Sequence, residues 1–329
     1  MASIRSLFWL AIVCFLVPAA DGRAAATSCK FSLGQSKPIF AGVQLRRMTF
    51  NCPSDGPRST AHVAQIDLHT QGLSLFALSA GSPQAPQTFL VSGLLRQPRN
   101  QIAVNANLFT ACCAYSGGGI PTALYGLAYS DGVMWSPVGN IPPQPPPPGD
   151  FLSSLVVVDG RASIVTLAKG QAPPPGLTLA VTGTHRILTN GANTAPTDTN
   201  PADWFGPTAR TVVGYGVGSN HGGQLVFPRL WLVAVDGSNG SAGVTLPQAA
   251  ELLLFLGATD GINLDGGGST TMVRQTASGP RAIIVPPTII NVPKDWPPNG
   301  GACQVTVKPG KSCERYVGFG LGVTAPSSR

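Results

Sequence analysis

Apolar and polar residues alternate along the first half of the chain in a way that predicts strands. Between Val63 and Ala77 the alternation continues on both sides of Gln71-Gly72, which is typical of a pair of strands with one buried face. Three further segments have the composition of strands: 101–109, 124–129 and 155–158. Residues 141–149 contain six prolines, which cannot donate to a strand ladder, so we expect an extended surface loop there.

The second half of the chain predicts several strands in succession. Residues 210–216 indicate a strand that ends in glycines, and residues 230–235 form a continuous apolar run, typical of a strand buried on both faces. Residues 190–207 are rich in Asn, Thr, Asp and Pro, so we expect a loop of the length that often carries function. Residues 262–264 predict a short strand that leads into three glycines.

The clearest helix signal starts at Thr245. Thr245 and Gln248 have the spacing of a capping box, Pro247 falls in the first turn, and Gly257 marks the end. The apolar face of this helix contains Ala249, Leu252, Leu253 and Leu256. The region at about 229–265 is therefore expected to form a strand-helix-strand unit.

Composition agrees with a fold rich in sheets and turns. The 329 residues include 40 glycines and 31 prolines, which favour turns and extended segments and argue against a helical bundle. With 43 % hydrophobic and 11 % charged residues, the chain can bury a core, which excludes a disordered protein. No internal repeat or linker divides it. We therefore predict an α+β fold: a mixed, sheet-rich single domain with few helices.

The first residues have the pattern of an export signal. Arg5 precedes an apolar run from Leu7 to Val17, and Ala24-Ala25-Ala26 offers a small-residue cleavage site, so we assign 1–26 to a signal peptide. A membrane anchor is the alternative, but the run is shorter than the roughly 20 residues that a spanning helix needs. The mature domain is expected at 27–329, secreted or periplasmic, without stable membrane insertion.

Six cysteines remain after the leader, and an oxidising compartment would let them pair. They are Cys29, Cys52, Cys112, Cys113, Cys303 and Cys313. A bond between Cys29 and Cys52 would tie down the N-terminus, and the last two flank a turn at Pro309-Gly310. The adjacent pair would form a vicinal disulfide or remain buried thiols. No Cys-x-x-Cys spacing supports a metal site.

The positive charge is spread thinly along the chain. A formal charge of +7 falls to +6 once the leader, with its two arginines and one aspartate, is removed. Without a run of Lys or Arg, the sequence gives no support to nucleic-acid binding. A mild positive balance suits an anionic substrate, although an incidental surface charge would look the same.

The segment Asp265-Gly266-Gly267-Gly268-Ser269 is the first candidate for chemistry. It follows a short strand, and its glycines would let consecutive N–H groups and a hydroxyl gather around a phosphate or a sugar. A second carboxylate, Asp236, ends the strand at 230–235, and it would reach the same sheet edge if the two strands are neighbours. Paired carboxylates are what glycoside cleavage needs. The alternatives are two simple turns.

Other polar residues suggest a binding role. Arg210 begins a strand and could grip a phosphate in bidentate fashion, or make a structural salt bridge. Asn105 and Asn107 alternate with apolar residues, so both would project from one face toward sugar hydroxyls, or satisfy a loop as buried amides. His221 lies within a glycine-rich turn, either as a proton donor or, as the turn favours, as a surface histidine.

Five motifs, in this order, resemble those of the phosphodiester glycosidase family. They are Asn105-Ala106-Asn107-Leu108-Phe109, Ala209-Arg210-Thr211-Val212-Val213-Gly214, Val235-Asp236-Gly237, Gly243-Val244-Thr245-Leu246 and Asn263-Leu264-Asp265-Gly266-Gly267-Gly268-Ser269-Thr270-Thr271-Met272. Two positions depart from the family's pattern: Ser238 stands where the family has Arg, and Leu108 where it favours Phe.

The resemblance implies a catalytic domain whose core covers about 60–325. Asp265 and Asp236 would act as catalytic carboxylates on a sugar-1-phosphodiester or a related glycosidic bond. The substrate would contact Asn105, Asn107, Arg210, Thr211, Asn263, Gly266, Gly267, Gly268 and Ser269. No cofactor is expected, and a divalent cation near Asp265 has no support in the sequence.

Two other functions stay open at this point. The chain could be a catalytically silent carbohydrate-binding protein that kept the pocket, a hypothesis that the Ser238 departure favours. It could also be a glycosidase that acts on a non-phosphorylated surface polysaccharide. The sugar, the aglycone, the anomeric outcome and the oligomeric state are not set by the sequence.

Overall fold

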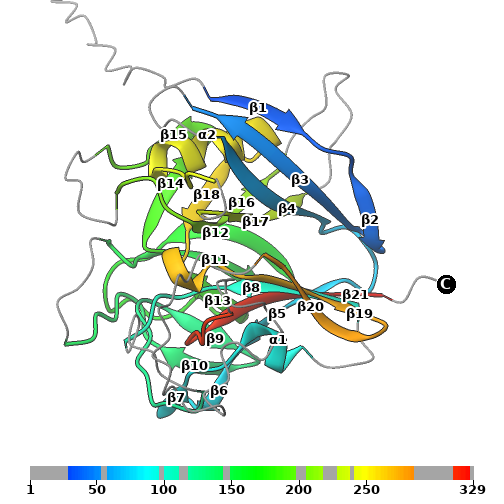
Figure 1. Cartoon of the computed structure of the whole chain (residues 1–329). Helices are drawn as coiled ribbons and strands as arrows, with labels where there is room; N and C mark the ends of the chain where they lie inside the picture. The colour runs from blue at the N-terminus through cyan, green and yellow to red at the C-terminus, as the bar shows by residue number, and fades with distance from the viewer. Residues whose placement is uncertain are drawn as a thin grey trace, which may run out of the picture.

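The computed structural model describes residues 29–52, 58–95, 100–110, 118–143, 149–197, 205–217, 228–237, 241–284 and 314–326. Within these ranges the chain is rich in sheets, with two α-helices, and every strand pair is antiparallel (Figure 1). The predicted sheet-rich α+β character is confirmed.

A nine-stranded sheet forms one layer. Its strands are β1 (Lys30–Leu33), β2 (Lys37–Phe40), β3 (Val43–Asn51), β4 (Ser59–Asp67), β14 (His185–Thr189), β15 (Ala192–Asn193), β16 (Arg210–Gly216), β17 (Arg229–Val235) and β18 (Asp260–Asn263). They lie in the order β1-β3-β4-β17-β16-β18-β14-β15, and β2 pairs with β3.

Two five-stranded sheets lie below this layer in Figure 1. One has the order β20-β19-β8-β21-β5 and consists of β5 (Ser74–Leu78), β8 (Asn100–Asn105), β19 (Met272–Thr276), β20 (Gly279–Ile284) and β21 (Gly320–Ala325). The other has the order β10-β9-β13-β11-β12 and consists of β9 (Ala128–Ser130), β10 (Val133–Ser136), β11 (Ser153–Val158), β12 (Arg161–Thr166) and β13 (Leu177–Thr182). A small hairpin joins β6 (Ala80–Ser82) and β7 (Ala85–Gln87), and the short α1 spans Val91–Leu94.

The main helix, α2 (Leu246–Leu256), begins and ends where the sequence predicts. The Thr245 hydroxyl accepts from the Gln248 N–H, the Gln248 side chain accepts from the Thr245 N–H, and Gly257 closes the helix in the left-handed conformation. Along the chain β17, α2 and β18 follow one another, but β16 lies between the two strands in the sheet. The expected strand-helix-strand unit of adjacent strands is therefore not confirmed.

The prediction of a strand pair on the two sides of Gln71-Gly72 is wrong. β4 pairs with β3 and β17, whereas β5 pairs with β21 in a different sheet. The turn between β4 and β5 carries the chain from one layer to the other. The alternating apolar residues of the two strands therefore pack against different neighbours.

Two hydrophobic cores lie on opposite faces of the nine-stranded sheet. Alternate residues of β17 enter the core shared with β8 and β21, namely Leu230, Leu232 and Ala234. The intervening residues enter the core under α2, namely Trp231, Val233 and Val235. Burial on both faces requires an apolar side chain at each position, which explains the continuous run read from the sequence.

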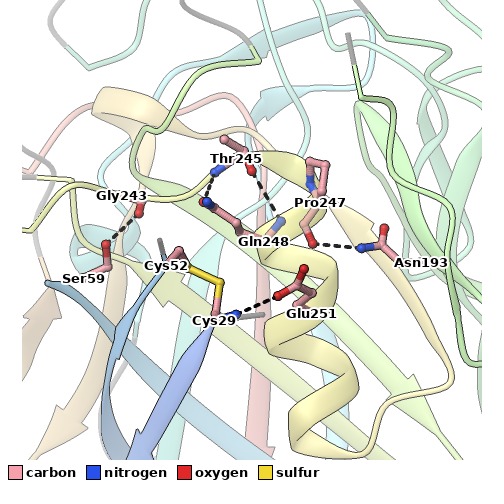
Figure 2. Close-up of a disulfide and its surroundings, with 9 residues drawn as sticks. All are labelled: Cys29, Cys52, Ser59, Asn193, Gly243, Thr245, Pro247, Gln248 and Glu251. Carbon is pink, nitrogen blue, oxygen red and sulfur yellow. Dashed lines mark hydrogen bonds between the residues drawn. A yellow bond between two sulfur atoms is a disulfide. The ribbon is translucent and has the colours of Figure 1, made fainter. Parts of the chain in front are cut away.

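The N-terminal strand is fastened to this framework by a disulfide. Cys29 and Cys52 are bonded, with 4.2 Å between their Cα atoms, and the Cys29 N–H donates to the Glu251 carboxylate on α2 at 3.2 Å (Figure 2). This predicted pair is confirmed. The other four candidate cysteines and the predicted signal peptide lie outside the described residues. Among the described helices, none has the length and apolar character to span a bilayer.

Candidate active site

Asp236 and Asp265 follow strands that end on either side of Ala209. A Cβ atom at Gly237 would lie 2.6 Å from the Ala209 nitrogen, and a Cβ atom at Gly266 would lie 2.9 Å from the Ala209 oxygen. The two segments therefore approach the start of β16 from opposite sides, and both aspartates reach the same edge of the sheet. β17 and β18 are not neighbours, because β16 lies between them and runs antiparallel to both. The residues that follow β17 and β18 therefore emerge at the edge where β16 begins.

The buried amide of Asn105 joins β8 to this edge. Its Nδ2 donates to the main-chain oxygen of Asp265 at 2.6 Å, while its Oδ1 accepts from the Thr211 hydroxyl at 2.6 Å and from the Thr271 N–H at 3.0 Å. The Asp265 N–H donates in turn to the Ala106 oxygen at 2.9 Å. These bonds make Asn105 and Thr211 supports for the Asp265 segment.

Asn107 supports a different part of the fold. Its Nδ2 donates to the oxygens of Tyr125 and Leu127 at 2.9 and 3.1 Å, and its Oδ1 accepts from the Thr182 N–H at 3.2 Å. The side chain is fully buried. The structure thus gives it the buried structural role that was the alternative to sugar binding.

The glycine segment is a tight turn. The Gly267 N–H donates to Ala209, the Ser269 N–H to Gly266 and the Thr270 N–H to Gly267. These three amides are already bonded within the protein, which differs from the expected cradle of consecutive free N–H groups. Gly266 needs to be glycine because a Cβ atom would press on the Ala209 oxygen, and Gly267 has a positive φ of 56°.

A row of buried hydroxyls follows the turn. Within the described part of the chain, Ser269 Oγ, Thr270 Oγ1 and Thr271 Oγ1 have no hydrogen-bond partner, and neither has Asn263 Oδ1. Buried polar atoms are nearly always paired in folded proteins. Four such atoms within nine residues therefore mark this segment as a place where a polar ligand or water belongs.

Arg210, at the start of β16, lies next to the turn. Val212 pairs with Asn263, so Arg210, two residues earlier on β16, lies on the same face as Asn263. Its Nε donates to the Val244 oxygen at 2.7 Å and one terminal nitrogen donates to the Gly206 oxygen at 3.0 Å. Burial lowers its pKa to about 10, which leaves it positively charged at neutral pH.

Asp236 is half-buried in a separate polar cluster. Its N–H donates to the Thr60 oxygen at 2.9 Å, and the Ser241 hydroxyl donates to its main-chain oxygen at 2.5 Å. Its charge also acts on His62, where it opposes the lowering of the pKa by burial and by Arg47. The segment after β17 is thus held in place before it passes Ala209. Ser238 and His221 lie outside the described residues.

A family model for phosphodiester glycosidase matches residues 152–324. The chain belongs to the phosphodiester glycosidase family. The matched region contains both aspartates, Arg210 and the whole glycine turn, while Asn105 and Asn107 precede it. No curated protein matches the chain.

Two solved structures share the fold of this family member. The catalytic domain of zebrafish N-acetylglucosamine-1-phosphodiester alpha-N-acetylglucosaminidase, auto-inhibited by pro-peptide, is 17 % identical with a TM-score of 0.55; the match covers 92 % of this chain and 88 % of that one. A protein of Burkholderia pseudomallei K96243 described as exported is 13 % identical with a TM-score of 0.52, and the match covers 91 % and 97 %.

Two residues of this family member reach the site although the sequence analysis did not single them out. His185 pairs in register with Asn263, and its Nδ1 lies 3.1 Å from the Thr184 hydroxyl, which also accepts from the Asn263 amide at 2.8 Å. Burial lowers the His185 pKa; the charge of Asp150 opposes this and that of Arg210 adds to it. A lone histidine in a strand gives no reason to expect this position.

Arg315 is the second such residue. A Cβ atom at Gly268 would lie 2.5 Å from its Cζ and 2.7 Å from each terminal nitrogen, so its guanidinium rests on the glycine turn. The one available signal was the pair of charges at Glu314-Arg315 in a chain with few charged residues.

A separate surface groove of about 700 Å³ lies at the far end of β16. Val158, Asp159, Arg161, Ala162, Ser163 and Tyr215 line it. Tyr215 is five residues along the strand from Arg210, or roughly 17 Å at the usual rise of a strand. Among the described residues, no candidate residue borders this groove, so it lies apart from the candidate site.

Proposed function

We propose that this family member hydrolyses a sugar-1-phosphodiester or a related glycosidic bond, with Asp265 and Asp236 as the reacting carboxylates. The observation that carries the proposal is the approach of both aspartate segments to Ala209, beside the row of unpartnered buried hydroxyls. Membership of the phosphodiester glycosidase family supports the same class of reaction.

Glycoside cleavage divides the work between two carboxyl groups. One protonates the leaving oxygen, and the other acts at the anomeric carbon, either as a nucleophile or as the base that activates water. Asp265 is almost completely buried, with 3 % of its surface exposed, and its main chain is held by Asn105 and Ala106. Such fixing suits a group that must keep its geometry through the reaction.

The surroundings favour a substrate that carries negative charge. Arg210 is buried and cationic, and the charge of the whole chain is +7. Two of its N–H groups already donate to carbonyl oxygens, so we assign it the role of a fixed positive charge in place of the bidentate grip expected from the sequence. The hydroxyls of Ser269, Thr270 and Thr271 are available to bind sugar or phosphate oxygens.

We also propose that the protein works outside the cytoplasm. The leader-like residues 1–26 and the Cys29–Cys52 disulfide support export, as does the fold shared with the Burkholderia protein described as exported.

The test is the release of free sugar from a panel of sugar-1-phosphodiesters and plain aryl glycosides, by the mature protein and its Asp265→Asn variant. Asp131→Asn is the control, because Asp131 is an exposed aspartate of the turn between β9 and β10. Release that disappears only in Asp265→Asn supports a glycosidase that depends on Asp265. Release from no substrate by a folded protein would favour the carbohydrate-binding function, and equal release with and without phosphate would favour a neutral glycan substrate.

A further inference from the structure

The guanidinium of Arg315 lies so close to Gly268 that a larger residue there would displace it. All three atoms near the hypothetical Cβ belong to the guanidinium, at 2.5 to 2.7 Å. The φ of Gly268 lies outside the left-handed region. Glycine at 268 therefore leaves room for the guanidinium and lets a positive charge lie on the turn.

The residues on both sides of Arg315 are anchored. The Glu314 carboxylate accepts from the Ser92 N–H at 2.9 Å and from the Ser92 hydroxyl at 2.5 Å. Val317 exchanges two main-chain hydrogen bonds with Phe89, at 2.8 and 2.9 Å. Arg315 thus extends from a fixed stretch of backbone, so binding a ligand there does not have to order the main chain.

The turn under Arg315 is the segment with incomplete hydrogen bonding. Ser269, Thr270 and Thr271 follow Gly268 directly, all are fully buried, and their hydroxyls have no partner among the described residues. Guanidinium cations and hydroxyl donors are groups that bind phosphate in proteins. The planar guanidinium matches two phosphate oxygens, and the hydroxyls can donate to the others.

We propose that Arg315 binds the phosphate of the substrate and so determines the preference for a phosphodiester over an uncharged glycoside. The inference rests on the proposed hydrolase function and names the residue that recognises the anionic part of its substrate.

The experiment compares kcat/KM for a sugar-1-phosphodiester and for an uncharged aryl glycoside of the same sugar. In Arg315→Gln we expect a loss of roughly 10- to 150-fold on the phosphodiester, the range for a hydrogen bond to a charged group. The uncharged glycoside should change less than about threefold. Arg315→Lys should retain part of the preference, because it keeps the charge but not the fork.

Two further variants separate the position of the guanidinium from a general loss of positive charge. Gly268→Ala keeps Arg315 but pushes its guanidinium away, so it should lower the phosphodiester preference as Arg315→Gln does. Arg229→Gln removes a half-buried arginine at the other end of β17 and should change neither substrate. An equal loss on both substrates, or no loss on the phosphodiester, would overturn the proposal.

Failure of the hydrolase function would give a different result. If the wild-type protein releases no sugar from either substrate, binding of a sugar-1-phosphate is measured by calorimetry. Weaker binding by Arg315→Gln, with unchanged binding by Arg229→Gln, would then still support Arg315 as the phosphate ligand. Equal binding by all three proteins would reject it. If Arg315→Gln does not fold, Arg315→Lys and Gly268→Ala take its place in both measurements.

Discussion

The Nδ2 atom of Asn105 donates a 2.6 Å hydrogen bond to the main-chain oxygen of Asp265, across 160 positions of the sequence. β8 ends at Asn105 in one sheet, and Asp265 lies two residues after the end of β18 in another, so the bond joins the two sheets. A proposed catalytic carboxylate is therefore positioned by the contact between two layers, and its placement depends on how well these layers are joined.

Replacing Asn105 with Ala should destabilise the fold. The change leaves the Asp265 oxygen, the Thr211 hydroxyl and the Thr271 N–H without their partner in a buried place, which should cost about 3 kcal/mol or more. Denaturant unfolding measures the free energy. Asn193→Ala is the control, because Asn193 is exposed and its side-chain amide donates to the Pro247 oxygen at the surface; it should change stability by less than about 0.5 kcal/mol. Equal losses in both variants would contradict the central role of Asn105.

The Cys29–Cys52 disulfide should contribute substantially to stability. It joins residues 23 apart, and closing a loop of this size is worth about 3 kcal/mol in the chain-entropy description. Cys29→Ser, Cys52→Ser and the double variant should lose the same free energy of unfolding, since each removes the same bond. An unchanged unfolding midpoint in the double variant would show that the bond contributes nothing in solution.

How far the sequence predicts the fold depends on the range of the signal. The helix at Leu246–Leu256 was predicted to the residue because its cap is local: Thr245 and Gln248 are three positions apart. The two-sided burial of β17 was predicted because an apolar residue at each position has one physical explanation. The partners of β4 and β5 were predicted wrongly, because alternation identifies a buried face but not the strand beside it.

The site shows the same limit. The sheet edge that joins Asp236, Asp265 and Arg210 was anticipated from strands, glycines and a family resemblance. The contact of Arg315 with Gly268 spans 47 positions and depends on the route of the chain before β21, which no local pattern encodes. His185 likewise reaches Asn263 only through the pairing of β14 with β18.

Stability should fall in mild acid because of two histidines. Burial lowers the pKa of His62 and of His185 below the ordinary 6.5, so the unfolded chain takes up their protons at a higher pH than the folded chain. Their contribution is fully present above pH 6.5 and is lost as the pH falls below that value. Unfolding free energies between about pH 8 and pH 5 should show this decline.

The double variant His62→Gln/His185→Gln should flatten that part of the profile. The exposed His69 provides the matched control, and His69→Gln should keep the wild-type slope. A double variant with the same slope as the wild type would assign the decline to other groups.

The two aspartates should be separable by their response to the leaving group. A phosphate is a good leaving group and needs little protonation, whereas an alkyl alcohol needs an acid. Loss of the general acid should therefore slow an alkyl glycoside by roughly 100-fold or more and a phosphodiester far less. Loss of the base or nucleophile should slow both substrates alike. Added azide attacks the anomeric carbon in its place, so it should restore part of the rate of that variant. Rates of Asp236→Asn and Asp265→Asn on the two substrates, with and without azide, give the assignment. If a variant loses less than threefold on both substrates and azide changes nothing, that residue has no part in the mechanism. For Asp236 this result would leave the turn after β17 as its structural role.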